Sequence, residues 1–350
     1  MFKMFSGMMG LDVGIDLGSS NTVVYVKDKG IVFSEPSAVA TKKFPRSENY
    51  EIIAVGHDAK AMSGKVPGGI EAVWPLEGGV IANFDMTQEL LRHCIKRVSA
   101  NNSFIVHPRV VISIPAEVTG VERRAVIDAT LGAGAGEAYI VEEPISAALG
   151  VGLPINKPNG NMIIDIGGGT SEVSVISLGG IVVTSSLRSA GRTMDNAIIN
   201  MIRQRYALLI GEITAEEVKN TIGSALPMET ELEMNVKGRD LSDGLPRSCT
   251  VSSIEVREAM GSVFTGIEDM VKVALEKTPP ELAKDVVDRG VIMTGGVALM
   301  NGLAERLSRA INTPVVVAEK PLFSVALGIG KILDDISSMR KALTPVGGSK

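Results

Sequence analysis

The sequence has few cysteines and no cluster of basic residues, and both shortages exclude classes of protein. Its two cysteines, Cys94 and Cys249, lie far apart and belong to no CxxC pair, so neither a disulfide framework nor a cysteine-based metal site is expected. We expect free thiols in the core of a protein from a reducing compartment. The formal net charge is −5, and the chain is not expected to bind nucleic acid, because phosphate backbones require clustered Lys and Arg.

Long hydrophobic runs are also missing. The charge-free stretch 173–187 is interrupted by Gly, Ser and Thr and is shorter than the ~20 apolar residues that span a membrane. The first residues, MFKMFSGMMG, contain no unbroken hydrophobic region and no Ala-x-Ala-like cleavage site, so no secretory signal peptide is expected. With 350 residues, of which 45% are hydrophobic and 21% charged, the composition indicates a globular protein with two domains.

Several common nucleotide and metal motifs do not occur. Neither Gly64–Lys65 nor Gly330–Lys331 is followed by Ser or Thr, which excludes a Walker A loop. The run GAGAGE, which begins at Gly132, follows a helical pattern and not a strand, so it is expected to end a helix. The three histidines are never four positions apart, which excludes a metalloprotease HExxH helix.

The sequence does contain one strand–turn–strand pattern twice. GIDLGSSNTVVYV begins at Gly14, and IDIGGGTSEVSVISLGG begins at Ile164. In both segments an apolar strand ends in an aspartate and continues into a turn of small residues. At one constant offset along the chain, the matching pairs are Asp16 and Asp165, Gly18 and Gly167, Asn21 and Thr170, Val24 and Val173, and Val26 and Val175.

The repeated turn suits phosphate binding. Small residues let backbone N–H groups approach an anion closely, and a neighbouring hydroxyl or amide adds donors. Two such turns that face each other would hold a polyphosphate from both sides, and Asp16 and Asp165 would hold the water shell of Mg²⁺. A single turn of this kind is better explained by a tight hairpin. The repeat, with acid, glycine and hydroxyl in register, favours phosphate binding.

Strand-like and helical segments alternate along the chain, which predicts an α/β fold with sheets covered by helices. The repeat predicts two similar halves, joined by a hinge helix in EEPISAALGVGLPI. Pro144 is favourable at the first position of this helix, so Glu143 is the expected N-cap.

The same pattern suggests where the domains begin and end. We expect the first domain to comprise residues 1–150 and 321–350, with a turn-rich small subdomain at about 36–79. The second domain would span 151–320, with a small subdomain at about 188–249. This second insertion contains the polar, hairpin-like KGRDLSDGLPR.

Four features are similar in order and spacing to those of the actin, Hsp70 and sugar-kinase superfamily. They are the two turns and the segments VEEPISAALGVG and VIMTGGVALMNGL. Over nearly the whole chain the sequence more closely resembles the MreB family, the bacterial actins of rod-shaped cells. The segments that carry this resemblance are GIDLGSSNT, EPSAVA, PLEGGVIANFD, VERRAV, EEPISAALGVGLPI, LLIGEITAEEVKNTIGSA, VKGRDLSDGLPR, VKVALEKTPPELAKDV and VALGIGKIL. The resemblance implies an actin-like, ribonuclease H-like fold of duplicated domains, with the nucleotide in the cleft between them.

The resemblance also implies the residues of a site for ATP and Mg²⁺. Glu143 would orient the attacking water and the Thr170 hydroxyl would assist it, since phosphoryl transfer mainly requires positioning and charge stabilisation. Asp16 and Asp165 would hold the metal through water. The cofactor-binding residues would be the first phosphate turn, Gly18, Ser19, Ser20 and Asn21, the second, Gly167, Gly168, Gly169 and Thr170, the ribose and adenine contacts Glu216 and Lys219, and the adenosine turn, Gly295 and Gly296.

Some of these residues have simpler explanations. Glu143 could be only a helix cap, and Glu216 with Lys219 could be a surface ion pair at i, i+3. The segment TAEEVK predicts a capping box, with Thr214 as the N-cap and Glu217 three residues later.

The sequence departs from the usual MreB pattern at two positions. Val297 stands where a third glycine is common, and Arg192 stands where an acidic residue is common. The contacts with the base and with the second small subdomain are therefore the least well defined.

The implied function is that of a cytoskeletal ATPase. It would polymerise with ATP bound, hydrolyse ATP slowly within membrane-associated filaments, and organise lateral cell-wall synthesis to maintain rod shape. Its expected partners are other copies of itself, a membrane-spanning adaptor and the cell-wall elongation proteins, at a cytoplasmic location on the inner face of the membrane. One alternative is a metabolic kinase of the same fold, although the second turn has no extra acid to serve as general base. The other is an Hsp70-like chaperone, for which the chain leaves no room for a peptide-binding domain.

We expect apolar side chains to contact the membrane surface. An N-terminal helix would present one apolar face as an interfacial anchor, although isolated helices this short are marginal in water and a strand or tail is the alternative. Each anchor would bind weakly, and a filament firmly, because it presents many anchors at once. The anchor residues are Phe2, Phe5, Met8 and Met9, with Phe104 and Ile105 as a second apolar tip that could instead begin the next strand.

Overall fold

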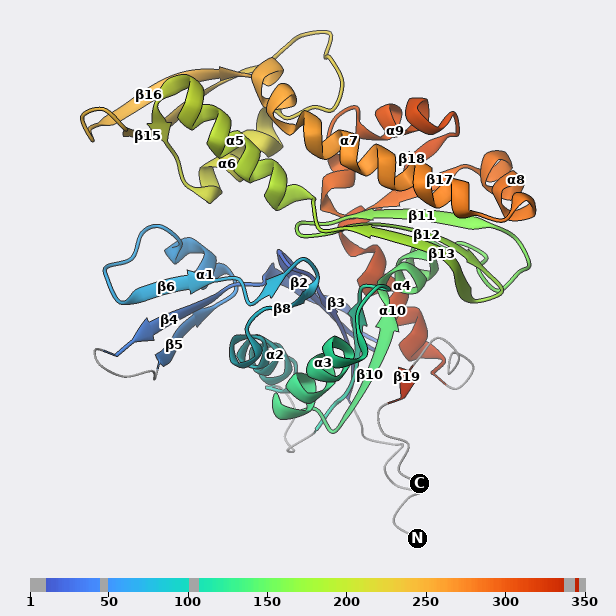
Figure 1. Ribbon diagram of the computed structural model, residues 1–350. Helices are drawn as coiled ribbons and strands as arrows, with labels where there is room; N and C mark the ends of the chain where they lie inside the picture. Colours follow the sequence, from blue (N-terminus) through green and yellow to red (C-terminus); the bar gives the residue numbers. More distant parts are fainter. Residues whose placement is uncertain (1–10, 45–49, 101–106, 337–343, 346–350) are drawn as a thin grey trace. The chain divides into compact units, whose positions relative to one another are not determined.

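The computed structural model describes residues 11–44, 50–100, 107–336 and 344–345. The chain forms two compact units (Figure 1). The domain limits expected from the sequence stay a prediction. Among the described residues, no helix has the length and apolar character needed to cross a membrane. The first unit comprises Met1–Asn159, Ile176–Val182 and Leu322–Lys350, and the second comprises Gly160–Val175 and Val183–Pro321.

A six-stranded sheet forms the centre of the first unit, in the order β19-β10-β9-β1-β2-β3. Strand β1 is parallel to β9, which is parallel to β10, whereas β2 and β3 extend the sheet in antiparallel fashion. The apolar side chains of β1 explain its central position, since Val13 and Ile15 are fully buried. The strands are β1 (Asp12–Leu17), β2 (Asn21–Val26), β3 (Gly30–Pro36), β9 (Arg109–Ile114), β10 (Glu137–Glu142) and β19 (Thr344–Pro345).

Close helix packing supports this sheet. Helices α4 (Glu143–Gly150) and α10 (Ser324–Asp334) cross at glycines. A Cβ on Gly150 would lie 1.8 Å from a carbonyl oxygen of α10, and one on Gly328 would lie 1.7 Å from a carbonyl oxygen of α4. Gly14 of β1 likewise leaves room for Ile329 of α10. Helix α10 therefore packs directly against the strand that leads into the first turn. Two further helices of this unit are α2 (Phe84–Ser99) and α3 (Gly120–Gly132).

The insertion expected at about 36–79 forms a small sheet in the order β5-β4-β6, followed by the hairpin β7-β8. Its core is made of small side chains, including Ala38, Ala40 and Ala59. The elements are β4 (Val39–Lys43), β5 (Tyr50–Val55), α1 (His57–Met62), β6 (Ile70–Val73), β7 (Leu76–Glu77) and β8 (Val80–Ile81).

The second unit is built around a five-stranded sheet in the order β13-β12-β11-β17-β18. Strand β11 is apolar and buried along most of its length, and it is parallel to β17. Phe264 of the long helix α7 is fully buried in the core of this unit. The elements are β11 (Asn161–Ile166), β12 (Ser171–Ser177), β13 (Gly180–Leu187), α5 (Gly191–Tyr206), α6 (Glu212–Ile222), α7 (Ser253–Lys277), α8 (Pro280–Arg289), β17 (Val291–Thr294), η1 (Gly296–Leu299), α9 (Leu303–Ile311), β18 (Val315–Val317) and η2 (Pro321–Phe323). The chain passes between the units within β12, β13 and η2, so the end of β12, the start of β13 and the end of η2 belong to the first unit.

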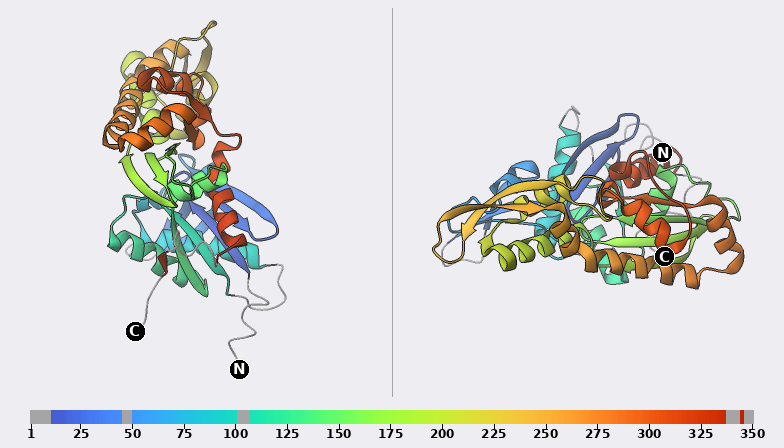
Figure 2. Two further views of the ribbon diagram at one scale, coloured as in Figure 1. Left: turned by 90° about the vertical axis from the view of Figure 1, so that its right-hand side faces the viewer. Right: turned by 90° about the horizontal axis from the view of Figure 1, so that it is seen from above.

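The hairpin expected from KGRDLSDGLPR is confirmed. It is formed by β15 (Glu233–Asp240) and β16 (Pro246–Ser252), which join β14 (Leu208–Leu209) in a three-stranded sheet. Figure 2 shows the hairpin projecting from the second unit.

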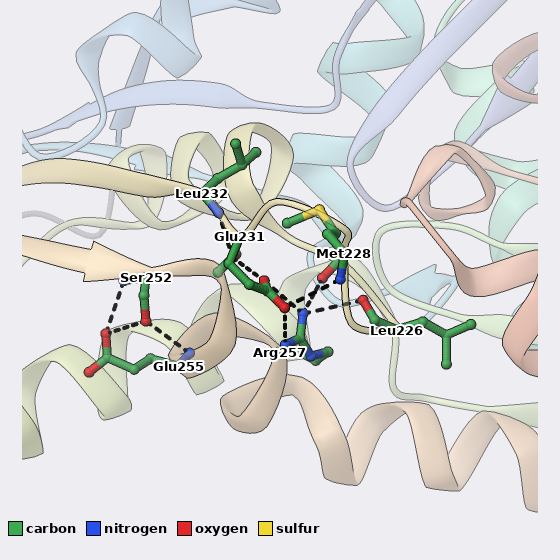
Figure 3. Close-up of polar contacts among 9 residues, drawn as sticks. Leu226, Met228, Glu231, Leu232, Ser252, Glu255 and Arg257 are labelled. Atoms are coloured by element: carbon green, nitrogen blue, oxygen red, sulfur yellow. Dashed lines mark hydrogen bonds and ion pairs between the residues drawn. The ribbon is translucent and has the colours of Figure 1, made fainter.

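Arg257 of α7 holds the loop that leads into this hairpin (Figure 3). Its guanidinium donates to Glu231 at 2.7 Å and to the Ser224 hydroxyl at 2.8 Å. Hydrogen bonds from Arg257 and then Ser253 lower the pKa of Glu231 to about 2. The loop is therefore fixed by charge-assisted hydrogen bonds at the N-terminal end of α7.

The free thiols expected from the sequence are present. Cys94 is buried in the core of the first unit, whereas Cys249 on β16 is only partly buried. Cys94 therefore lies in the core as expected, whereas Cys249, on the three-stranded sheet, is partly buried and packs against the core of the second unit.

Candidate nucleotide site

The first turn, Gly18 to Asn21, joins β1 to β2. The N–H of Gly18 donates to the carbonyl of Asn21 at 3.1 Å, which closes the turn. Glycine is required there, because a Cβ would lie 2.7 Å from the Asn21 carbonyl oxygen. Ser37 holds the turn from one side: its N–H donates to the Ser20 carbonyl at 2.9 Å, and its hydroxyl donates to the Gly18 carbonyl at 2.6 Å. The N–H and C=O of a trans peptide point in opposite directions, so the N–H of Ser19 faces away from Ser37.

Further hydroxyl groups fix the first turn in place. The Thr22 hydroxyl donates to the Ser37 hydroxyl at 2.7 Å, because the proton of Ser37 is used on Gly18. The Ser19 hydroxyl accepts from the N–H of Gly79 in the β7-β8 connection at 3.0 Å. The turn is thereby attached to the small subdomain at two separate points.

Asp16 lies at the end of β1, directly before the first turn. Its carboxylate accepts a hydrogen bond from the hydroxyl of Ser113 on β9 at 2.9 Å. Burial raises the pKa of Asp16 to about 6, and the hydrogen bond from Ser113 opposes this. A nearby cation would favour the charged carboxylate, so this position suits the expected role near a metal ion.

Glu143 lies at the same edge of the sheet as Asp16. Strands β1, β9 and β10 are parallel, and Ser113, which bonds Asp16, pairs with Val141 of β10. Glu143 follows the end of β10, two strand spacings or about 10 Å across the sheet from β1. The carboxyl ends of parallel strands are the usual position of ligands in such sheets.

The expectation that Glu143 is an N-cap is wrong. Helix α4 begins at Glu143, and Glu142 is the N-cap, without a side-chain capping bond. Proline is tolerated within the first helical turn because its missing N–H has no helical partner, so the helix begins one residue earlier. Glu142 is extended and pairs with Arg123 at 2.9 Å. Glu143 is therefore the first helical residue.

The second turn, Gly167 to Thr170, repeats the closure of the first. The N–H of Gly167 donates to the Thr170 carbonyl at 2.8 Å. Its support is different, because the carbonyls of Gly167 and Gly168 accept from the backbone N–H groups of Gly191 and Arg192, at 3.2 and 2.8 Å. These N–H groups open helix α5, so backbone groups at a helix N-terminus hold the second turn.

Gly295, which the resemblance assigns to the adenosine turn, lies beside Asp165. Strand β11 pairs with β17 so that Asp165 faces Thr294. Gly295 has φ 87, and a Cβ there would lie 2.5 Å from Asp165 Oδ1 and 2.3 Å from the Ile166 carbonyl oxygen. Gly296 opens η1, and Val297, which departs from the usual pattern, is a buried packing residue.

The capping box expected at Thr214 is wrong. Helix α6 begins at Glu212 with Gly211 as N-cap, so Thr214 lies inside the helix. The buried residues Ala215 and Val218 belong to an apolar face that continues to the end of the helix, and the helix starts one turn before the polar segment that resembled a cap. Glu216 and Lys219 nevertheless lie on α6, as expected.

Lys219 is not in a surface ion pair with Glu216. Its ammonium lies 2.8 Å from Asp195 Oδ1 and donates to the Gly191 carbonyl at 3.1 Å, and both charged residues are 9% exposed. Asp195 was not predicted from the sequence. Its spacing from Gly191 and Ile198 on α5 places it on the buried face of the helix, which was the available signal.

Each unit thus gathers one part of the expected site. The first unit contains Asp16, the first turn and Glu143. The second unit contains Asp165, the second turn, Gly295 and Gly296, and also Glu216 and Lys219 of α6. The expected membrane residues Phe2, Phe5, Met8, Met9, Phe104 and Ile105 lie outside the described residues.

Two units that each combine a mixed sheet, a closed strand–turn–strand and a small added sheet define an actin-like fold. MreB5 of Spiroplasma citri, solved with ADP, superposes with a TM-score of 0.88 at 36% identity and covers 95% of this chain and 99% of that one. The MamK double helical filament gives a TM-score of 0.78 at 22% identity, over 93% of this chain and 99% of that one, and shows the fold alone.

The family is shown by sequence. A model of the MreB/Mbl protein family matches residues 10–341. The cell shape-determining protein MreB of Escherichia coli K12 is 49% identical over 96% of this chain and 97% of its own length. The cell shape-determining protein Mbl of Bacillus subtilis is 44% identical over 95% and 99%. The chain belongs to the MreB/Mbl family, which confirms the resemblance and favours the cytoskeletal function over a metabolic kinase or a chaperone.

Proposed function

We propose that the protein binds and slowly hydrolyses ATP and uses the nucleotide to control its assembly into filaments. The observation that carries this proposal is the duplicated turn. Each turn is closed by one backbone hydrogen bond and held through its carbonyl groups, so that peptide N–H groups remain for phosphate oxygens. MreB5 of Spiroplasma citri has been solved with ADP and with AMPPNP, which supports a nucleotide at these turns.

The residues at the turns fit Mg²⁺ as well as ATP. The carboxylates of Asp16 and Asp165 end equivalent strands, and Mg²⁺ prefers oxygen ligands and retains several waters. When bound, the ion would neutralise charge on the phosphates. Glu143 would orient the attacking water, and the Thr170 hydroxyl would hold it near the second turn. Lys219 and Glu216 would contact the ribose and adenine, with Gly295 and Gly296 against the adenosine.

Filament formation and control of cell shape follow from the family. Relatives that match nearly the whole chain are named cell shape-determining proteins. We propose that copies of this protein form filaments on the inner face of the cytoplasmic membrane and organise lateral cell-wall synthesis. A membrane-spanning adaptor and the cell-wall elongation proteins would be the partners.

Replacement of Glu143 by alanine tests the assignment of the hydrolytic residue. Glu143→Ala should lower the rate of phosphate release about 100-fold, because the carboxylate acts on water. Binding of MgATP and ATP-dependent sedimentation should remain within about twofold of the parent, because the turns that hold the phosphates are intact. A variant that cannot bind ATP would show that Glu143 has a different role, and a parent that neither binds ATP nor sediments with it would reject the proposed function.

The membrane proposal has its own test. Deletion of residues 1–9 should abolish co-sedimentation with liposomes and leave ATP-dependent assembly unchanged, because the anchor is separate from the turns. Lipid-free pelleting of both proteins is subtracted as the control. Equal liposome binding by the truncated and full-length proteins would reject the anchor.

A further inference from the structure

The ion pair between Asp195 and Lys219 is buried in the second unit, between α5 and α6. Both residues are 9% exposed, and they share the core of the unit with Met194 and Ile198. Moving two charges out of water is costly, and such a pair is weak evidence for stability by itself. A function for the pair is therefore more informative than a contribution to folding.

The ammonium of Lys219 has one N–H to spare. A lysine has three donors, and within the described part of the chain its ammonium donates to the Gly191 carbonyl at 3.1 Å and lies 2.8 Å from Asp195 Oδ1 as an ion pair. Because the four-carbon lysine side chain is flexible, its own structure does not set the direction of the ammonium. These two contacts set it, and with it the direction of the third N–H.

The charges around this ammonium indicate the kind of ligand. Burial raises the pKa of Asp195, Lys219 lowers it, and Glu216 and Glu212 raise it further. The carboxylates of Glu216 and Glu212 thus act on Asp195 in addition to its ion pair with Lys219. Negative charge on Asp195 disfavours a phosphate group beside it, whereas a sugar hydroxyl can accept from the ammonium and donate to a carboxylate.

We propose that Asp195 is a positioning residue that aims the ammonium of Lys219 at a ribose hydroxyl of the nucleotide. This inference rests on the proposed ATP binding and adds to it a residue that does not contact the ligand. Gly191 joins the ribose contact to the second turn, since its carbonyl holds Lys219 and its N–H holds the Gly167 carbonyl.

The test compares ATP with nucleotides that lack one hydroxyl. The parent and Asp195→Asn are titrated with MgATP, 2′-deoxy-ATP and 3′-deoxy-ATP. We expect Asp195→Asn to bind ATP about tenfold more weakly, the loss of one charge-assisted hydrogen bond. For the deoxy nucleotide that lacks the contacted hydroxyl, parent and variant should bind alike. An equal loss for all three nucleotides, or no loss for ATP, would overturn the proposal.

A matched control removes the same charge elsewhere on the neighbouring helix. Glu217 is exposed on α6, and Glu217→Gln should leave all three affinities unchanged. Loss of ATP affinity in this variant equal to that in Asp195→Asn would show a general effect of charge and overturn the proposal.

A second pair of variants covers the case in which Asp195→Asn fails to fold, since it leaves a buried charge unpaired. Lys219→Met and the double variant with Asp195→Asn remove the charge of Lys219. If Asp195 acts only through Lys219, both should bind ATP with the same reduced affinity. A further loss in the double variant would overturn the positioning role. If the parent protein fails to bind ATP, the proposed function is rejected. If the parent binds ATP and the variants bind it equally well, only the inference about Asp195 is rejected.

Discussion

The two turns have the same closure and different supports. In the first turn, the side chain and N–H of Ser37 hold the carbonyls of Gly18 and Ser20. In the second turn, backbone N–H groups at the start of α5 hold the carbonyls of Gly167 and Gly168. A duplicated motif therefore has one copy that depends on a hydroxyl side chain and one that depends on the N-terminus of a helix.

This difference has consequences for coupling within each unit. The first turn is bonded to Ser37 and Gly79, which flank the small subdomain of the first unit. A shift of that subdomain would act on the first turn through side-chain hydrogen bonds that substitutions can remove. The second turn is bonded to a helix whose backbone donors no substitution other than proline removes.

The largest expected effect separates the two turns at equivalent glycines. A Cβ on Gly18 would lie 2.7 Å from the Asn21 carbonyl oxygen, whereas one on Gly167 would lie 3.5 Å from the Thr170 carbonyl oxygen, an ordinary contact. Gly18→Ala should lower the free energy of unfolding by about 3 kcal/mol, in the range of overpacking. Gly167→Ala should change it by less than about 0.5 kcal/mol. Denaturant unfolding of both variants measures this, and equal costs would mean that the turns tolerate a side chain equally.

The sequence predicted the parts of the fold that depend on local patterns. The alternation of segments, the repeated strand–turn–strand and the hairpin at KGRDLSDGLPR all have short-range signals, and the structure contains them. The starts of α4 and α6 were predicted too late in the sequence, since the structure places them at Glu143 and Glu212. Proline and acidic residues are compatible with several positions in a first turn, and the tertiary structure decides between them.

The sequence likewise predicts only those parts of the candidate site that have a local pattern. Residues on the turns have a recognisable local composition, so their pattern was visible. Ser37, Ser113 and Asp195 act through partners that are far away in sequence, and only the fold brings these partners together. Such contacts leave only a weak signal, namely a polar residue in a segment that is otherwise buried.

A second prediction concerns the acid that precedes the first turn. The pKa of Asp16 is raised from 3.8 to about 6 by burial, so the folded state binds this proton more tightly than the unfolded state does. The stability that this provides is present below pH 4 and is lost as the pH rises through about 6. Without Mg²⁺, Asp16→Asn should therefore raise the free energy of unfolding at pH 7.5 by at most about 3 kcal/mol, since one pKa unit corresponds to about 1.4 kcal/mol and the amide carries no charge.

Denaturant unfolding between pH 4 and 7.5 in the presence of a metal chelator measures this effect. Asp28 is exposed, so Asp28→Asn serves as the control and should keep the pH dependence of the parent. If Asp16→Asn and the parent lose stability equally over this range, burial of Asp16 does not determine the pH dependence.

The smallest expected effect tests the hydroxyl that supports the first turn against one beside the second. Ser37 and Ser171 are both fully buried. Ser37 donates to the Gly18 carbonyl within the first turn, whereas Ser171 donates to the Ser189 carbonyl outside the second turn. Each alanine variant loses one buried hydrogen bond and should be destabilised to a similar extent. Only Ser37→Ala should also weaken MgATP binding, by about fivefold, because only there does a carbonyl of the phosphate turn lose its partner.

Titration with MgATP alongside denaturant unfolding separates the two effects, with the exposed Ser34→Ala as the control. A parallel loss of ATP affinity in Ser171→Ala would mean that affinity follows stability, and the difference in support between the turns would then have no effect on binding.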